Sequence, residues 1–536
     1  MTSPRTVAET TAYESTSLHA DVVAFIEALA PQPTLHVTTM GSSAEGRDMP
    51  VLVLSADGRF APEAAHEAAR AEGRPVVLIV CNIHAGEVEG KEAALMLARD
   101  VTTGDMAHLA SGATVVLIPI YNPDGNDRID AKNRRIDPPT AHGQDGPATG
   151  VGTRYTGAGI NLNRDYTKLA AVESRLLMQL VNAWQPHVIV DSHTSNGSPH
   201  AYALTYDTSH TVESGCRDTI LYTRDTLLPA VGDALLARTG LRTFFYGNFR
   251  DNDEPTSGWE SYPGLPRYGS HYRGLTPCLD ILLEAYSYAP FRDRVHVTYE
   301  IFVEILDYAA AHGREIVDLV ERTAADVVAR GKAPQPDDLV GVNYGVPSRS
   351  PAGELVYDYP AYPLFDTDIA AWDLETMRSW RLEDGTVTHW PNTFYCRYLP
   401  EVSVRRPRAY RVPARETAAI EHLKLHNLEL REVGPQGGTA TVERFVILDR
   451  DTTASPDVGY ETRTETVFFG TCERHDVQLA PGDILVPMDQ PLANVAIYLL
   501  EPQSDDGLVR WGWFDHCSIR ENFPVERVLV TDALSG

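Results

Sequence analysis

The sequence predicts an α/β protein with a β-rich C-terminal region. Over roughly the first 330 residues, apolar runs of strand length alternate with segments of helical periodicity. The apolar runs are continuous, which is typical of mostly parallel strands whose sheet is covered by helices on both faces. Beyond about residue 331, the pattern changes to strand-like runs separated by Pro, Gly and Asp turns.

Apolar periodicity places the elements of the first region in chain order. Strands are expected where apolar residues follow one another without a break, at 50–55, 75–82, 114–122, 187–193 and 278–286. Helices are expected where apolar residues recur every three to four positions, at 21–30, 89–101, 173–185, 224–240 and 299–331. The fourth of these helices ends on a glycine, which is a typical stop signal.

The composition changes near residue 331. Residues 331–350 are rich in Pro, Gly and polar side chains and are expected to link a domain at 1–330 to a β-rich domain at 351–536. A chain of 536 residues is too long for one ordinary core, so two domains are the default expectation. The second domain is expected to hold a few helical turns at 416–424 and strands at 443–451, 464–473, 475–480 and 494–502.

Composition excludes several function classes. A formal net charge of -28 argues against a nucleic-acid partner and against docking on anionic membranes, because both need a basic surface. No apolar run approaches the roughly 20 residues that cross a bilayer, and the N-terminal residues show no secretory signal. The six cysteines have no paired spacing and are expected to be reduced thiols. These features predict a cytoplasmic protein.

Polar residues follow several of the predicted strands. His84 and Glu87 follow the strand at 75–82, His193 ends the strand at 187–193, and Glu284 lies near the end of the strand at 278–286. A Pro-Gly turn follows a fourth strand. In doubly wound sheets, ligand sites lie at the carboxyl ends of strands. We therefore expect these side chains to meet at one edge of the sheet.

Two histidines and a glutamate form a known zinc ligand set. Two imidazoles and one carboxylate leave the fourth position open for water. A catalytic zinc also needs a carboxylate that is not a ligand and can take the proton of that water. Glu284 is the natural candidate, because it is a lone acid after an apolar run.

The motif H-x-x-E is weak evidence when taken alone. It occurs in this chain at His84, His210, His312 and His426. A lone histidine or glutamate near a strand end is more often a hydrogen-bonded structural residue than a metal ligand. Only the copy at His84 ends a predicted buried strand and opens a predicted helix, whose positive N-terminal dipole favours a carboxylate.

Five ordered motifs resemble those of the zinc carboxypeptidase family. They read NIHAGEVEGKEA, YNPDGND, GINLNRDY, VDSHTSN and LLEAY, and the resemblance covers roughly residues 10 to 325. It implies a three-layer α/β/α sandwich around a mixed eight-stranded sheet. It also implies one zinc ion per chain and a substrate with an amide bond to cleave.

The resemblance assigns roles to particular residues. His84, Glu87 and His193 look like the zinc ligands, and Glu284 looks like the general base and proton shuttle. Asn163 and Arg164 look like the pair that holds the terminal carboxylate of a substrate. Arginine supplies a fork of donors that matches a carboxylate, and asparagine adds another donor. The alternative for Arg164 is an ion pair with Asp165 or another surface acid.

The arginine that polarises the scissile carbonyl is ambiguous. The family carries it after the NPDG turn, where this chain has Asp137, a residue that cannot take the role. Arg134 lies nearby. Arg154 resembles the arginine shortly before the LNR motif in related acylases, aspartoacylase and succinylglutamate desuccinylase. We favour Arg154 over Arg134, and either residue could instead be an ordinary surface arginine.

The chain departs from the family pattern at Asn161. The family usually has an aspartate there, which accepts a hydrogen bond from the first zinc histidine. An amide oxygen can also accept that bond, but it makes the histidine a less basic ligand.

Several tyrosines compete for the role of capping the substrate. Tyr262, Tyr268 and Tyr272 all precede Glu284, and spacing favours Tyr262. The same segment offers two further candidate pocket groups, Arg267 and His271.

The predicted function is hydrolysis of an amide bond next to a free carboxylate, in the manner of a carboxypeptidase. A first alternative is an acylase that acts on a small N-acyl amino acid or a specialised metabolite. A second is a binding module whose metal site has lost catalysis. Peptides or N-acyl amino acids are the expected partners, and a homo-oligomer is possible. Trp511 and Trp513 are expected in the core of the C-terminal domain, not at the catalytic cleft.

Overall fold

The structure of the chain is a computed structural model. It describes residues 3–135, 143–195, 200, 202–251, 257–344, 365–367, 388–390, 394–395, 398–454 and 464–534. Part of the predicted linker at 331–350 therefore lies outside the described residues.

A central sheet organises the N-terminal region. Within the described residues, it holds eight strands in the order β1-β2-β4-β3-β5-β10-β6-β7. Their bounds are β1 Leu35–Ser42, β2 Asp48–Leu54, β3 Val76–Cys81, β4 Thr114–Ile118, β5 Val188–Thr194, β6 Leu204–Asp207, β7 Thr243–Phe245 and β10 Leu279–Ala285.

The sheet is mixed, as the family resemblance implies, and the α/β fold class is confirmed. Strands β4, β3, β5 and β10 run parallel to one another at the centre. Antiparallel pairs join β1 to β2, β2 to β4 and β10 to β6. The prediction of a mostly parallel sheet from continuous apolar runs is therefore right for the centre and wrong toward the edges. The reason is that the antiparallel strands β2 and β6 are also buried, so they lack the alternation that marks a solvated face.

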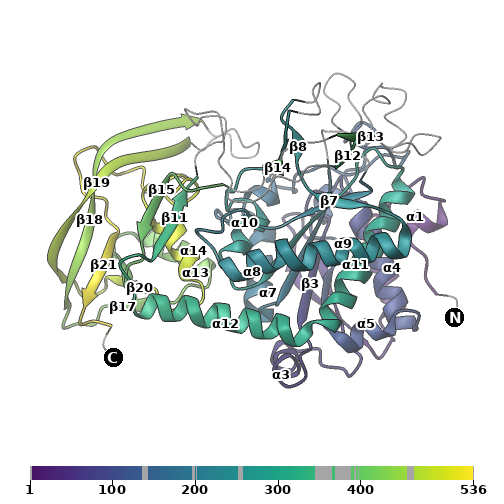
Figure 1. The fold of residues 1–536 in the computed structure, drawn as a ribbon, viewed down its shortest axis with the longest axis horizontal. Coiled ribbons are helices and arrows are strands. Elements are labelled where there is room, and N and C mark those ends of the chain that lie inside the picture. Colours follow the sequence, from purple (N-terminus) through teal and green to yellow (C-terminus); the bar gives the residue numbers. More distant parts are fainter. Residues whose placement is uncertain are drawn as a thin grey trace.

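Helices cover both faces of the central sheet (Figure 1). One face packs against α4 and α11, which are flanked by α2, α5 and α9, and the other against α3, α7 and α10. The bounds are α2 His19–Leu29, α3 Pro62–Glu72, α4 Glu89–Thr103, α5 Ala107–Gly112, α7 Val172–Trp184, α9 Leu228–Thr239, α10 Gly269–Gly274 and α11 Phe291–Ala311. Shorter helices are α1 Val7–Thr10, α6 Pro123–Asn126 and α8 Arg217–Tyr222.

The strand side chains divide between two apolar cores. Val77 and Ile79 of β3 enter the core under α4 and α11, and Leu78 and Val80 enter the core on the opposite face. This follows from the twofold alternation of side chains along a strand. The second core continues without a break into the C-terminal region, where it includes Ile497. The C-terminal region therefore shares one apolar core with the sheet face that α3, α7 and α10 cover.

A second sheet dominates the C-terminal region. Within the described residues, its six strands have the order β17-β20-β16-β21-β18-β19, and β18 pairs with β19 over a long antiparallel ribbon. The elements are β11 Leu339–Asn343, β14 Phe394–Tyr395, β15 Val402–Arg405, β16 Ala409–Val412, α13 Thr417–Leu425, β17 Arg431–Glu432, β18 Gly438–Ala454, β19 Thr464–Leu479, β20 Ile484–Pro487, α14 Ala493–Leu500 and β21 Glu526–Thr531. Smaller strands are β8 Asn248–Phe249, β9 Trp259–Glu260, β12 Phe365–Thr367 and β13 Thr388–Trp390.

Four expected elements differ in the structure. The strand predicted at 494–502 is wrong, because this segment forms helix α14. All residues of α14 are buried, and periodicity cannot distinguish a fully buried helix from a buried strand. The strands predicted at 464–473 and 475–480 form the single strand β19. The helix predicted at 299–331 is divided at His312 into α11 and α12 Gly313–Lys332.

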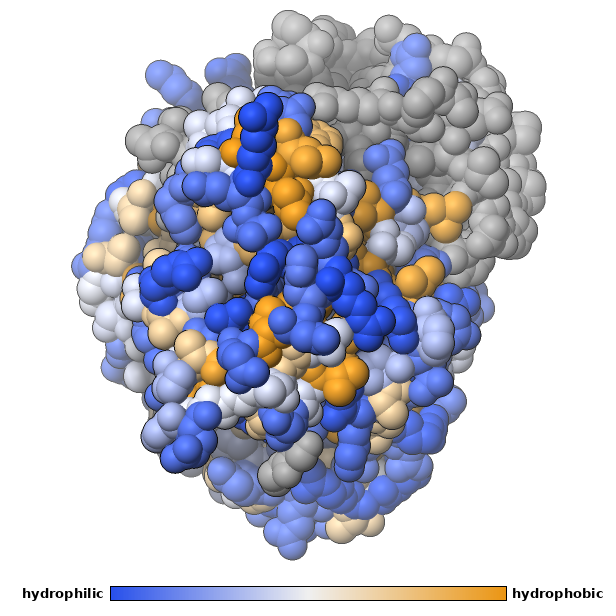
Figure 2. Space-filling model, turned by 90° about the vertical axis from the view of Figure 1, so that its left-hand side faces the viewer, coloured by the Kyte–Doolittle hydropathy of each residue, from blue (hydrophilic) through white to orange (hydrophobic). Residues whose placement is uncertain are grey.

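Helix α12 extends from the N-terminal region along the C-terminal region and contacts α14 there (Figure 1). The end of the molecule formed by the C-terminal region is largely hydrophilic, with small apolar patches (Figure 2). In the described segments, no helix combines the length and apolar character needed to span a membrane.

Candidate metal centre and active site

The turn after β3 presents His84 and Glu87. Asn82 takes a left-handed backbone conformation with φ of 65°. Its amide nitrogen lies 3.3 Å from the carbonyl oxygens of both Ala85 and Glu87, and the Glu87 N–H donates to the His84 carbonyl at 2.9 Å. Asparagine tolerates this backbone conformation and bonds locally in turns, which explains its place at the strand end. The turn therefore holds the His84 and Glu87 side chains on the same side of the backbone.

Helix α4 and strand β5 approach closely beneath this turn. A Cβ on Gly90 of α4 would lie 2.5 Å from Oγ of Ser192 on β5. Only glycine permits this approach, because any larger residue would push the helix away from the strand. The close packing brings His193, the next residue of β5, up to the turn after β3.

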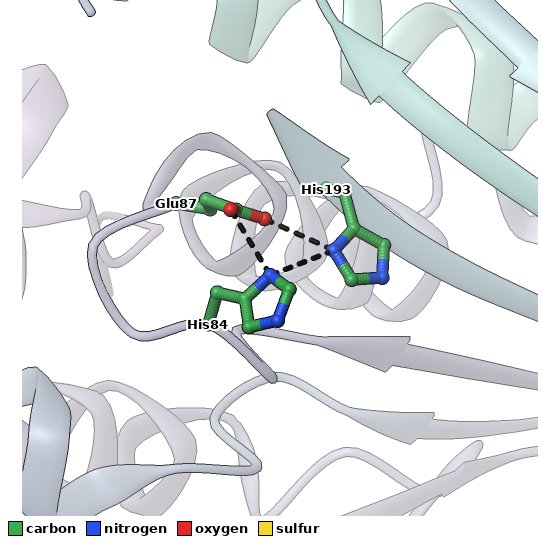
Figure 3. A group of neighbouring side chains, drawn as sticks. All are labelled: His84, Glu87 and His193. Atoms are coloured by element: carbon green, nitrogen blue, oxygen red, sulfur yellow. Dashed lines mark hydrogen bonds and ion pairs between the residues drawn. The ribbon is translucent and has the colours of Figure 1, made fainter. Parts of the chain in front are cut away.

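The side chains of His84, Glu87 and His193 converge (Figure 3). Nδ1 of His84 lies 3.0 Å from Oε1 of Glu87, and Nδ1 of His193 lies 3.0 Å from Oε2. The two Nδ1 atoms are 3.2 Å apart. Among the described residues, this is the one group of three or more His, Cys, Asp or Glu side chains with ligand atoms within 4.8 Å of one another.

This donor set fits a zinc ion. The Nδ1 atoms of His84 and His193 face each other and the buried Glu87 carboxylate. One shared proton cannot form hydrogen bonds with the lone pairs of all these atoms. A cation placed between these nitrogen and oxygen atoms would be coordinated by all of them at once. Two imidazoles and one carboxylate are also the ligand types that zinc prefers when a fourth position stays open.

The Nε2 atoms of His84 and His193 each lie near an oxygen atom of a neighbouring side chain. Nε2 of His84 lies 3.2 Å from Oδ1 of Asn161, the position where the family pattern has aspartate. Nε2 of His193 lies 3.1 Å from Oδ1 of Asp191, whose Oδ2 accepts from Arg273 at 3.0 Å. Oxygen atoms at such positions help to orient metal-binding histidines. Asp191 was missed in the sequence, although its place two residues before His193 puts it on the same strand face.

The buried charges shift the pKa values of the three side chains. Burial lowers the pKa of His84 to about 3, and the Arg154 guanidinium acts in the same direction. Burial would also lower the pKa of His193, but the Asp191 carboxylate raises it to about 10. For Glu87, burial opposes ionisation, yet His84 and Arg134 hold its pKa well below the ordinary value. Glu87 is therefore a carboxylate at neutral pH.

Glu284 lies on β10 beside His193 on β5. The two residues are partners in the parallel register, so their side chains share one face of the sheet. The Glu284 side chain is buried, and its pKa is raised to about 8. Burial is the largest cause, the Glu87 charge adds to it, and His193 opposes it.

A cavity of about 620 Å³ collects the candidate residues. Eight of the residues predicted for the site line it: His84, Glu87, Arg134, Arg154, Asn163, Arg164, Tyr262 and Glu284. The lining also includes Arg135, Tyr246 and Tyr268. A volume of this size accommodates a small molecule or the end of a peptide.

The two candidate arginines differ in their contacts. Arg134 donates to Glu87 at 2.8 Å and to Gln144 at 2.6 Å, and reaches the carbonyls of Thr194 and Ser195 at 3.3 Å. Arg154 lies 3.4 Å from Glu87, and its side chain is 32% exposed. Arg134 is therefore held by several acceptors around the metal centre. The family's usual arginine position, Asp137, lies outside the described residues.

Asn163 and Arg164 lie in a short 3₁₀ helix, Leu162–Arg164, capped by the Asn161 side chain. The Asn163 side chain accepts from the Gly269 N–H at 2.9 Å, and the Arg164 guanidinium lies 4.1 Å from the centre of the Tyr268 ring. Both residues thus contact the segment that carries the candidate tyrosines.

The structure separates the tyrosine candidates. Tyr262 and Tyr268 line the cavity, whereas the Tyr272 hydroxyl lies 2.6 Å from Nδ1 of His426 and is turned toward the C-terminal region. His271 and Arg267, proposed as pocket groups, are buried and do not line the cavity. The Arg267 side chain instead contacts Asp506 and Glu465 of the C-terminal region.

The other H-x-x-E copies have different surroundings. His210 pairs with Asp207 at 3.0 Å, His426 meets Tyr272, and His312 pairs with Glu315 on the exposed surface. Only the copy at His84 lies in the candidate metal centre.

Comparison with known proteins adds the deciding observation. A family model described as zinc carboxypeptidase matches residues 22–187, which include His84, Glu87, Asn163 and Arg164. Residues 22–187 therefore belong to the zinc carboxypeptidase family. Members of this family are hydrolases that depend on zinc, which agrees with the His84, Glu87 and His193 donor set.

Similarity to known proteins extends beyond the matched segment. The chain is 21% identical over 503 residues to carboxypeptidase 2 of Trichophyton rubrum, covering 88% of this chain and 78% of that protein. It is 31% identical over 149 residues to carboxypeptidase D of Mus musculus, covering 26% of this chain and 10% of that protein. Among solved structures, a metallo-carboxypeptidase from Burkholderia cenocepacia is 18% identical with a TM-score of 0.39, covering 55% of this chain and 69% of that one.

Proposed function

We propose that this protein hydrolyses the amide bond next to a free terminal carboxylate, as a carboxypeptidase, with one zinc ion held by His84, Glu87 and His193. One observation carries the proposal. A single cavity exposes two of the three converging donors, the buried acid Glu284, and the Asn163–Arg164 pair. Zinc bound there would polarise a carbonyl oxygen and lower the pKa of a bound water toward ~7.

Glu284 serves as the proton carrier in this proposal. Its carboxylate takes a proton from the attacking water and passes it to the nitrogen of the departing amine. The raised pKa suits a group that must both accept and return a proton near neutral pH. Glu284 is the register partner of His193, so it lies next to the metal centre. It is not one of the three converging donors.

Arg154 serves as the group that stabilises the developing oxyanion. Burial lowers its pKa to about 10, so it remains cationic at neutral pH. Its contact to Glu87 at 3.4 Å is long, which leaves the guanidinium able to turn toward a substrate oxygen. Arg134 has a different part in this proposal, because its contacts with Glu87 and Gln144 hold the metal ligand in place.

Asn163 and Arg164 receive the terminal carboxylate. Their cavity position allows the guanidinium and the amide to donate to one carboxylate, and Tyr262 closes over it. Anchoring the carboxylate fixes which amide bond reaches Glu284, so cleavage removes one residue at a time from the end of a peptide.

The first prediction concerns the substrate carboxylate. We expect the zinc-loaded protein to release C-terminal amino acids from peptides with a free carboxylate, with kcat/KM at least 100-fold above that for the same peptides as C-terminal amides. The reason is that an amide cannot form charge-assisted hydrogen bonds with Arg164. Mass spectrometry of a peptide panel measures the products. A preference for single N-acyl amino acids over longer peptides would favour the acylase alternative, and loss of the carboxylate preference would contradict the proposal.

The second prediction separates the two arginines. Replacing Arg154 by alanine is expected to lower kcat about 100-fold with little change in zinc content, because an oxyanion donor is typically worth this much. Replacing Arg134 by alanine is expected to weaken zinc binding instead, because Glu87 loses the hydrogen bond that holds its carboxylate in place. Steady-state kinetics and zinc titration of both variants give the comparison. If the Arg134 variant instead lost kcat and the Arg154 variant lost zinc binding, Arg134 would be the residue that stabilises the developing oxyanion.

A further inference from the structure

The segment between β9 and α10 connects the active-site cavity to the C-terminal region. We call residues 261–268 the substrate loop, because it carries Tyr262 and Tyr268, which line the cavity. The loop begins with two contacts to the C-terminal half of the chain. The Ser261 N–H donates to the Tyr395 carbonyl at 2.9 Å, and the Tyr398 hydroxyl donates to the Ser261 carbonyl at 2.8 Å.

A buried ionic cluster holds the other end of the substrate loop. Arg267 donates through Nε to Asp506 at 3.0 Å and through a terminal nitrogen to Glu465 at 3.1 Å. The Arg267 backbone N–H also donates to Asp506. Trp511 donates to Asp506 at 2.8 Å, and its ring lies 4.5 Å from the Arg267 guanidinium. We call Arg267, Glu465, Asp506 and Trp511 the Arg267 cluster.

The Arg267 cluster is almost completely buried. The side chains of Arg267, Glu465 and Asp506 are 5%, 4% and 0% exposed. Charges removed from water are expensive to bury, and removing one partner leaves another uncompensated. Backbone and side chain of Arg267 are both bound to Asp506, so the cluster fixes the path of the chain as well as the position of one side chain.

The residues that follow Arg267 contact the carboxylate-binding pair. Tyr268 packs its ring under the Arg164 guanidinium, and the Gly269 N–H donates to the Asn163 side chain. Asn163 uses its carbonyl oxygen in that bond, which turns its amide N–H groups away from Gly269. The two residues that follow Arg267, Tyr268 and Gly269, therefore connect the Arg267 cluster to Arg164 and Asn163.

We propose that the C-terminal region, through Asp506 and Glu465, positions the substrate loop and with it the Asn163–Arg164 pair for the substrate's terminal carboxylate. Arg267 is a positioning residue in this arrangement and does not touch the substrate. The inference rests on the proposed function, since it assigns the loop to carboxylate binding. It gives the C-terminal region a part in substrate affinity, separate from the proton transfer at Glu284.

The test compares KM with kcat in variants of the cluster. Glu465→Gln and Asp506→Asn keep the size of each side chain and remove its charge. We expect KM for a peptide with a free carboxylate to rise at least tenfold, with kcat within threefold of wild type and zinc content unchanged. The inhibition constants of free amino acids, used as competitive inhibitors, should rise in parallel with KM. The inhibition constants of the corresponding amino acid amides should not change. Unchanged KM in folded variants would overturn the proposal.

Asp483→Asn is the matched control. Asp483, just before β20, is buried and pairs with Arg411 of β16 at 2.7 Å. Its side-chain hydrogen bonds to described residues go to Arg411, Ala414 and Ala480, all outside the substrate loop. The control variant should leave KM within twofold of wild type, and an equal rise in KM would show a general structural effect and overturn the proposal. If a single variant does not fold, the triple variant Arg267→Met, Glu465→Gln, Asp506→Asn removes all three charges together and must show the same rise in KM. Absence of any peptide cleavage by wild type would instead refute the proposed function itself.

Discussion

Replacing Glu284 by glutamine is expected to lower kcat about a thousandfold or more while zinc remains bound. The carboxamide keeps the shape of the side chain but cannot accept a proton from the attacking water. Proton transfer by a positioned side chain contributes about 10²- to 10⁴-fold to catalysis. Glu284 is not one of the converging donors, so its loss leaves the three ligand side chains in place. Single-turnover kinetics with zinc analysis of the same sample measure both effects.

The pH profile gives an independent readout of the same residue. Glu284 must be ionised to accept a proton, so kcat/KM of wild type should rise with pH as this carboxyl loses its proton. Burial raises the pKa of Glu284 to about 8, and the positive charge of zinc would lower it, so the acidic limb should lie below pH 8. The residual activity of Glu284→Gln should lack this limb. Near wild-type activity in the zinc-bound variant would refute the role given to Glu284.

Removing zinc is expected to abolish hydrolysis and to lower the melting temperature. The ligand side chains come from the turn after β3 and from β5, so a bound ion links these two strands of the central sheet. A ligand at 1,000 times its Kd stabilises the folded state by about 4.1 kcal/mol. Dialysis against a chelator, followed by titration with zinc, should remove and restore both activity and thermal stability. Activity that survives complete metal removal would contradict the proposal.

Two variants sharpen the metal experiment. His193→Ala should prevent recovery with zinc, and Asp191→Asn should weaken zinc binding by about 10- to 100-fold, because Asp191 orients the His193 ring. His312→Ala is the matched control, since His312 belongs to another H-x-x-E motif on the exposed surface. That variant should bind zinc as wild type does.

The strand ends were predictable because their signals are local. The apolar run before His84 and the one before Glu284 each specify a buried strand, and polar residues at their carboxyl ends fall on one edge of the sheet. The structure brings His84, Glu87 and His193 together and places Glu284 beside them. Their catalytic roles stay predictions. The segment 494–502 was not predictable, because a short, mostly apolar run suits a buried helix as well as a buried strand.

The sequence alone determined the α/β class, the order of the central strands along the chain and the residues that could bind zinc. These follow from hydrophobic periodicity and from the chemistry of side chains at strand ends, which act over a few residues. Only the tertiary structure decided that Arg134 is bound to Glu87, that Asp191 meets His193, and that Arg267 turns to Asp506 instead of the cavity. The partner of a buried charge depends on packing, and Arg267 and Asp506 are 239 positions apart in the chain.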